Sequence, residues 1–147
     1  MLILCQRDPR WANVKIGQST EKVGSKGCTI TAVSMSLSWA GCYKNPGDLA
    51  QKLTFTKDGL IIWQSIAEIT CMKFLWRGYP SNFKREQIDE ALKSQTKTCL
   101  LNVDNGNHWV LGIYRVPLTN KYWVADPFYG TRRFYSGVIG YAILQKK

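Results

Sequence analysis

Cys28 stands where the sequence can activate a thiol for nucleophilic attack. A cysteine attacks as its thiolate, and the free thiol has a pKa of about 8.5, so an active site must lower that pKa. A helix N-terminus does this, because its unpaired amides and its dipole favour negative charge. Cys28 opens the run CTITAVSMSLSWA, in which Ile30, Val33 and Leu37 recur at helical spacing until Gly41. The spacing predicts Cys28 at the N-terminal end of a buried helix.

His108, the only histidine of the chain, is the residue that can pair an imidazolium with this thiolate. It begins the β-rich run HWVLGIY after an Asn-Gly turn, and Asp126 ends the next β-rich run, YWVADP. Two strands joined by the short LTN turn are expected to be antiparallel neighbours, which brings the end of the second beside the start of the first. We therefore expect Asp126 to orient the imidazole, with Asp104 and Asn107 as alternatives if the loop geometry differs.

An acyl-transfer site also needs donors aimed at the developing oxyanion. The backbone amide of Cys28 is one candidate, and the side-chain amide of Gln6 is the second. Gly27, immediately before the cysteine, is expected to allow a sharp backbone turn and to leave room for a substrate beside the sulfur.

The remaining cysteines give no sign of a metal site or of a disulfide framework. The chain has five cysteines, an odd number, without any CxxC spacing, and its single histidine excludes sites built from histidine clusters. Cys42, Cys71 and Cys99 stand beside apolar residues and are predicted to be inert core thiols. Cys5 has no helix start after it and is not expected to be the nucleophile. No metal or organic cofactor is implied.

The order of the predicted elements indicates a single α+β domain over residues 1–147. Helical patterns follow the first helix at 46–53, 60–70 and 83–95, and a strand is predicted at 71–76. After residue 97 the residue pattern changes from helical to β-rich. The β-rich runs lie at 98–103, 108–116, 121–127 and 132–136 and are separated by polar turns. We therefore expect N-terminal helices packed on a C-terminal antiparallel β-sheet.

The composition is basic, with 20 Lys and Arg against 10 Asp and Glu and a net charge of +10. This charge fits either a solvated surface or a weak attraction to a polyanion, and no basic arm or nucleic-acid motif decides between them. The N-terminal run is too short for a signal peptide, and no stretch approaches the ~20 apolar residues of a membrane span. We expect a monomer made in the cytoplasm without a signal peptide, acting on a cell wall or in a host cell only if it is released or delivered there.

Four short motifs, taken in order, resemble one known family. QRDPRW, GCTIT, HWV and ADP, which begin at residues 6, 27, 108 and 125, are similar to motifs of the papain-like cysteine peptidases related to bacteriocin-leader (double-glycine) peptidases. The resemblance covers nearly the whole chain and implies a papain-like fold. It also implies Gln6 in the oxyanion hole, Cys28 as nucleophile, His108 as base and Asp126 as its orienting partner. Thr29 departs from the usual glycine and narrows the space beside the nucleophile.

The resemblance implies a cysteine-dependent hydrolase of peptide or amide bonds. Cys28 is acylated first, and water activated at His108 then hydrolyses the acyl-enzyme. One setting is the processing of a protein or leader peptide. The other is cleavage of peptide cross-links in bacterial peptidoglycan, with which a phage origin is compatible. Two alternatives stay open: a catalytically silent papain-like module that binds peptide or polyanion, and a transglutaminase-like acyltransferase in which an amine replaces water.

Overall fold

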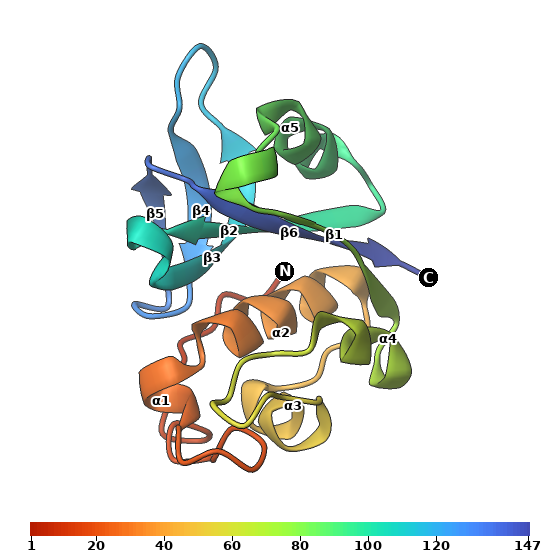
Figure 1. The fold of residues 1–147 in the computed structure, drawn as a ribbon, viewed down its shortest axis with the longest axis vertical. Helices are drawn as coiled ribbons and strands as arrows, with labels where there is room; N and C mark the ends of the chain where they lie inside the picture. The colour runs from red at the N-terminus through yellow and green to blue at the C-terminus, as the bar shows by residue number, and fades with distance from the viewer.

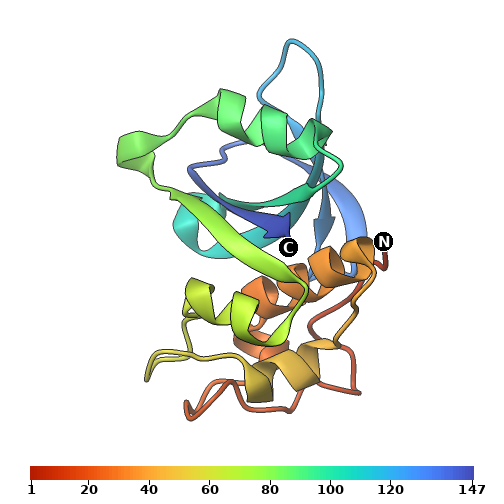
Figure 2. The same cartoon turned by 90° about the vertical axis from the view of Figure 1, so that its right-hand side faces the viewer.

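The computed structural model describes all 147 residues and arranges them in three layers (Figures 1 and 2). Helices α1 to α4 lie on one side of a six-stranded antiparallel sheet, and α5 covers the other side. The helices are α1 (Val23–Lys26), α2 (Cys28–Ala40), α3 (Pro46–Lys52), α4 (Ile66–Ile69) and α5 (Arg85–Lys93). The strands are β1 (Met72–Gly78), β2 (Lys97–Val103), β3 (His108–Arg115), β4 (Tyr122–Asp126), β5 (Thr131–Tyr135) and β6 (Gly140–Lys146). The expected α+β architecture is confirmed.

The inner strands β2 and β6 are buried on both faces, and each face belongs to a different hydrophobic cluster. Successive side chains of a strand point to opposite faces, so Leu100 belongs to the cluster that contains α2, whereas Leu101 belongs to the cluster that contains Ile88 of α5. The strands order themselves as β1-β6-β2-β3-β4-β5. The central strands consequently read as almost continuous apolar runs instead of alternating ones.

Helix α2 is the central element of the helical layer, and every residue from Ile30 to Leu37 is buried. A helix enclosed on all sides needs apolar or small residues around its whole circumference, which explains the sequence ITAVSMSL. Two of its buried hydroxyl groups have partners, since Ser34 Oγ donates to Lys44 O and Ser36 Oγ accepts from Thr98 Oγ1, whereas Thr31 Oγ1 has none. The helix ends at Gly41, whose φ of 87° gives the left-handed cap that glycine adopts without strain.

Three elements differ from the sequence-based expectations. Residues 60–70 form only a 3₁₀ turn, Trp63–Ser65, followed by the short α4, and the loop before Cys28 contains the unexpected helix α1. Strand β6 was also not expected, although it lies inside the sheet between β1 and β2. The strands predicted near residues 71–76, 98–103, 108–116, 121–127 and 132–136 are confirmed.

Cys42 and Cys71 form a disulfide, so the prediction that both are inert core thiols is wrong. The odd number of cysteines is compatible with a disulfide, because free thiols remain at Cys5, Cys28 and Cys99. The bond joins the residue after the α2 cap to the residue before β1, 29 positions apart. Cys99 is buried as predicted, and burial raises the pKa of its thiol well above the ordinary value. No helix has the length and apolar character that crossing a membrane requires.

Candidate active site

Cys28 is the first residue of α2, as its sequence context predicted, and its side chain is only partly exposed. The glycine before it has a different role from the one expected. Gly27 has a φ of −91°, which any residue adopts, so no special turn requires it. A Cβ at this position would instead lie 2.5 Å from the carbonyl oxygen of Val23. Gly27 is therefore required by the close packing of α1 against the start of α2.

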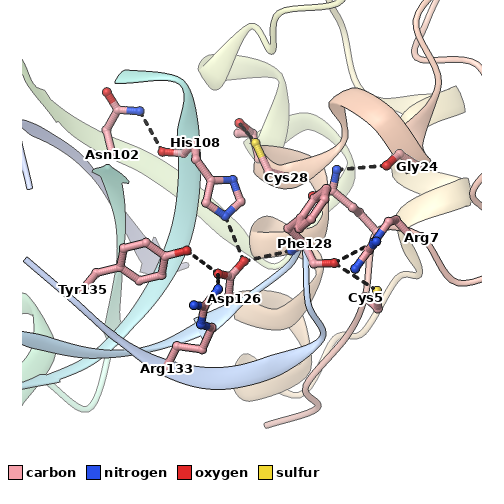
Figure 3. Close-up of polar contacts among 12 residues, drawn as sticks. Cys5, Arg7, Gly24, Cys28, Asn102, His108, Asp126, Phe128, Arg133 and Tyr135 are labelled. Atoms are coloured by element: carbon pink, nitrogen blue, oxygen red, sulfur yellow. Dashed lines mark hydrogen bonds and ion pairs between the residues drawn. The ribbon is translucent and has the colours of Figure 1, made fainter. Parts of the chain in front are cut away.

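The pairing of His108 with Asp126 follows from the β3–β4 hairpin. Leu111 of β3 lies opposite Ala125 of β4, so the start of one strand adjoins the end of the other. His108 Nε2 lies 2.8 Å from Asp126 Oδ1, as predicted from the hairpin (Figure 3). The two alternatives, Asp104 and Asn107, are exposed and do not bond the imidazole.

The imidazole of His108 lies between the sulfur of Cys28 and the carboxylate of Asp126 (Figure 3). Burial disfavours the thiolate, but hydrogen bonds from His108 and from the Trp109 backbone amide, together with the imidazolium charge, outweigh it and lower the pKa of Cys28. Burial also disfavours the imidazolium, yet its hydrogen bonds to Asp126 and Cys28 raise the pKa of His108 to about 9. The two shifts have opposite directions and both favour a thiolate–imidazolium pair, the form in which a cysteine is a reactive nucleophile.

The carboxylate of Asp126 is completely buried and accepts several hydrogen bonds. Burial raises its pKa, but donation from His108, from Tyr135 Oη at 2.5 Å and from Phe128 N at 2.9 Å lowers it below the ordinary value. Arg133 adds a cation 3.7 Å away. Asp126 thus stays ionised beneath the imidazole. Sequence reasoning missed Tyr135 and Arg133: their run was predicted only as a strand, and its spacing does not reveal which side chains reach Asp126.

Gln6 is buried against the turn that precedes Cys28. Its Nε2 donates to Gly24 O at 3.2 Å, and its backbone amide donates to Pro127 O at 2.8 Å. A primary amide has two N–H groups, and the structure gives Nε2 of Gln6 one acceptor, Gly24 O. The side-chain oxygen of Gln6 is buried without a partner. The first residue of a helix also has a backbone N–H without an acceptor in its own helix, so Cys28 supplies a second donor.

The N-terminal segment contacts the loop that follows Asp126 through hydrogen bonds and a cation–π interaction. Arg7 Nε donates to Phe128 O at 3.0 Å, and the Arg7 guanidinium lies 4.1 Å from the centre of the Phe128 ring (Figure 3). Cys5 Sγ donates to the same carbonyl at 3.5 Å. These contacts hold Gln6 in place, and they give Cys5 a structural position instead of a nucleophilic one.

Two pockets adjoin the Cys28–His108 pair. One, of about 350 Å³, is lined by Thr29 and Trp109, the immediate chain neighbours of the pair. The other, of about 250 Å³, is lined by His108 itself and by the Phe128 and Tyr135 rings. Trp109 has two kinds of contact. It packs on Trp63, with ring centres 5.5 Å apart, and it also forms a wall of the larger pocket.

The arrangement provides a nucleophile, a base, an orienting carboxylate and donors for an oxyanion, which together support acyl transfer. No group of three or more metal-ligating side chains is assembled in the structure. Comparison with family models, with curated proteins and with solved structures finds no match to this chain.

Proposed function

We propose that the chain is a cysteine hydrolase that cleaves a peptide or amide bond in a papain-like fold. The observation that carries the proposal is the His108 imidazole, bonded to buried Asp126 and adjacent to Cys28 at the start of α2. The proposal is also supported by the fact that the two layers contribute different groups to the site. The helical layer supplies the thiol and the sheet supplies both the imidazole and the carboxylate.

The chemistry follows from these positions. The Cys28 thiolate attacks the carbonyl carbon, and the resulting oxyanion accepts hydrogen bonds from Cys28 N–H and the second N–H of Gln6. Because Nε2 of His108 is bonded to Asp126, Nδ1 holds the proton that passes to the leaving amine as the C–N bond breaks. A thioester on Cys28 remains.

Water completes the reaction. It attacks the thioester carbonyl while His108, now neutral at Nδ1, accepts a proton from it. The C–S bond breaks, the carboxylic acid leaves, and the thiolate–imidazolium pair is restored. Asp126 holds the ring orientation in both steps and stabilises the imidazolium.

Incubation with a mixed peptide library tests the proposal, with products identified by mass spectrometry. We expect hydrolysis by the wild type and none by Cys28→Ala. If peptides are not hydrolysed but an added primary amine is acylated, the acyltransferase alternative is correct. If the library stays intact in both cases, the silent binding module is correct.

Purified bacterial cell walls separate the two proposed settings. Clearing of a cell-wall zymogram that depends on Cys28 supports a peptidoglycan peptide hydrolase. Hydrolysis of library peptides without any clearing supports a protein-processing peptidase instead.

A further inference from the structure

The larger pocket, of about 350 Å³, has a lining that the hydrolytic chemistry alone does not explain. Its lining includes Lys26 and Thr29, which lie just before and just after Cys28 in the chain, and Trp109, which follows His108. The opposite wall includes Arg77 and Tyr79, at the end of β1 and just beyond it. The pocket is therefore close enough to receive a side chain of a substrate whose carbonyl carbon is bonded to Cys28.

The position of His108 decides which side of the scissile bond enters this pocket. The imidazole delivers its proton to the leaving amine, so the leaving group must lie against its ring. The smaller pocket, which His108 lines together with Phe128 and Tyr135, meets that requirement. The larger pocket is lined by neighbours of the pair and not by His108. It consequently receives the acyl side, which stays attached to Cys28.

The charge in the larger pocket has one sign. Lys26 and Arg77 line it, and no Asp or Glu does. The Arg77 guanidinium lies 4.1 Å from the centre of the Tyr79 ring and 4.7 Å from that of the Trp109 ring, and it donates to Gly78 O. No carboxylate forms an ion pair with it. A partly buried cation held by aromatic rings without a counter-charge matches an anionic group on the ligand.

We propose that the substrate is a peptide with an acidic residue, glutamate or aspartate, at one of the two positions before the scissile bond. Its carboxylate binds between Lys26 and Arg77, and its methylene groups rest on Trp109. The assignment depends on the proposed function for the direction of the peptide, whereas the anionic pocket itself does not. The volume suits one side chain, which favours an acidic peptide over the repeating phosphates of a nucleic acid.

Matched electrophiles test the assignment on the intact protein. The probes are acetyl-Xaa-Ala and acetyl-Ala-Xaa chloromethyl ketones with Xaa as Glu or Gln, and the readout is the rate constant for alkylation of Cys28. Since a charged hydrogen bond contributes about tenfold or more in binding, we expect the Glu probe to react about tenfold faster in at least one register. Arg77→Gln should reduce that ratio to about one.

Arg85→Gln is the control, because Arg85 also lies against aromatic rings, Phe83 and Tyr122, but on α5 beyond the sheet. This variant should keep the wild-type ratio. Equal Glu and Gln rates, together with rapid labelling of Cys28 by iodoacetamide, would overturn the acidic specificity and leave the proposed function standing.

A binding measurement covers the case in which Cys28 behaves as an ordinary thiol toward iodoacetamide, which would refute the proposed function. Cys28→Ala is titrated with acetyl-Glu-Ala-amide and acetyl-Ala-Glu-amide, and with their Gln counterparts, while the tryptophan fluorescence of the protein is followed, to which Trp63 and Trp109 of the pocket contribute. Tighter binding of a Glu peptide that disappears in Arg77→Gln supports the anionic pocket. Equal titration midpoints for the Glu and Gln peptides, or no binding of either, would overturn the anionic pocket.

Discussion

Replacement of Asp126 by asparagine separates the charge of this residue from its shape. In Asp126→Asn, Oδ1 can still accept from His108 Nε2 and from Phe128 N, and the new amide nitrogen can donate to Tyr135 Oη. His108, Phe128 and Tyr135 can therefore each keep one hydrogen bond to this fully buried side chain. We expect the variant to fold and to keep the ring orientation of His108, while the imidazolium loses its buried counter-charge.

The size of the effect follows from the titration of His108. Its pKa lies at about 9, against an ordinary 6.5, which corresponds to about 3 kcal/mol favouring the protonated ring. Asp126 and Cys28 share this stabilisation, and one hydrogen bond to a charged group contributes about 1.5–3 kcal/mol. We therefore expect kcat/KM near neutral pH to fall about 10- to 100-fold. The upper limb of the pH–rate profile should move down by at least about one pH unit.

The assay is kcat/KM for a cleaved peptide between pH 5 and 10, roughly the range in which the pair titrates, with thermal unfolding measured in parallel. Asp48→Asn is the control, since Asp48 lies on α3, lines neither of the two pockets and forms no ion pair. This control should keep the wild-type rate and profile. A full-activity Asp126→Asn variant with an unchanged upper limb would refute the assigned role of the carboxylate.

Three further outcomes follow from the structure. The pH profile of kcat/KM should rise at a pH below the ordinary thiol pKa and fall through about pH 9, where the His108 imidazolium is lost; activity still rising above that pH would contradict the ion pair. Gly27→Ala should lower the free energy of unfolding by about 1–3 kcal/mol, because the new Cβ lies 2.5 Å from Val23 O; an unchanged melting temperature would contradict this. Replacing both Cys42 and Cys71 by serine should cost about 3–4 kcal/mol for a loop of this length, measured by urea unfolding; equal stability would mean that the bond contributes nothing.

The placement of the candidate site could be predicted where it depends on local patterns. The helical periodicity after Cys28 correctly identified a helix start. The short turn between two β-rich runs correctly brought His108 beside Asp126. Each inference used only a period or a turn length, which short stretches of sequence determine.

Features that depend on three-dimensional packing could not be predicted. The Cys42–Cys71 pairing requires the end of α2 to meet the start of β1, and parity of the cysteine count gives no information about that. Tyr135 lies opposite Tyr122 at the other end of β4, so the register of the two strands does not indicate its bond to Asp126. Gly27 was assigned to a turn because glycine is typical of turns. The structure requires a glycine there because any side chain would clash with Val23.

Strand β6 could have been found from the sequence. The run GYAILQ, at residues 140–145, is short, mostly apolar and follows a glycine-containing turn. Those features are typical of a strand buried on both faces. Its central place between β1 and β2 was not predictable, because the order of strands in a sheet does not follow their order in the chain.

The central claim is that His108 activates Cys28, and the pH dependence of Cys28 alkylation tests it most directly. Iodoacetamide labelling is followed by peptide mass spectrometry, which separates Cys28 from the free thiols Cys5 and Cys99, in the wild type and in His108→Ala. We predict rapid wild-type labelling well below pH 8, lost in the variant. A midpoint near the ordinary thiol pKa of about 8.5 in both proteins would contradict the claim.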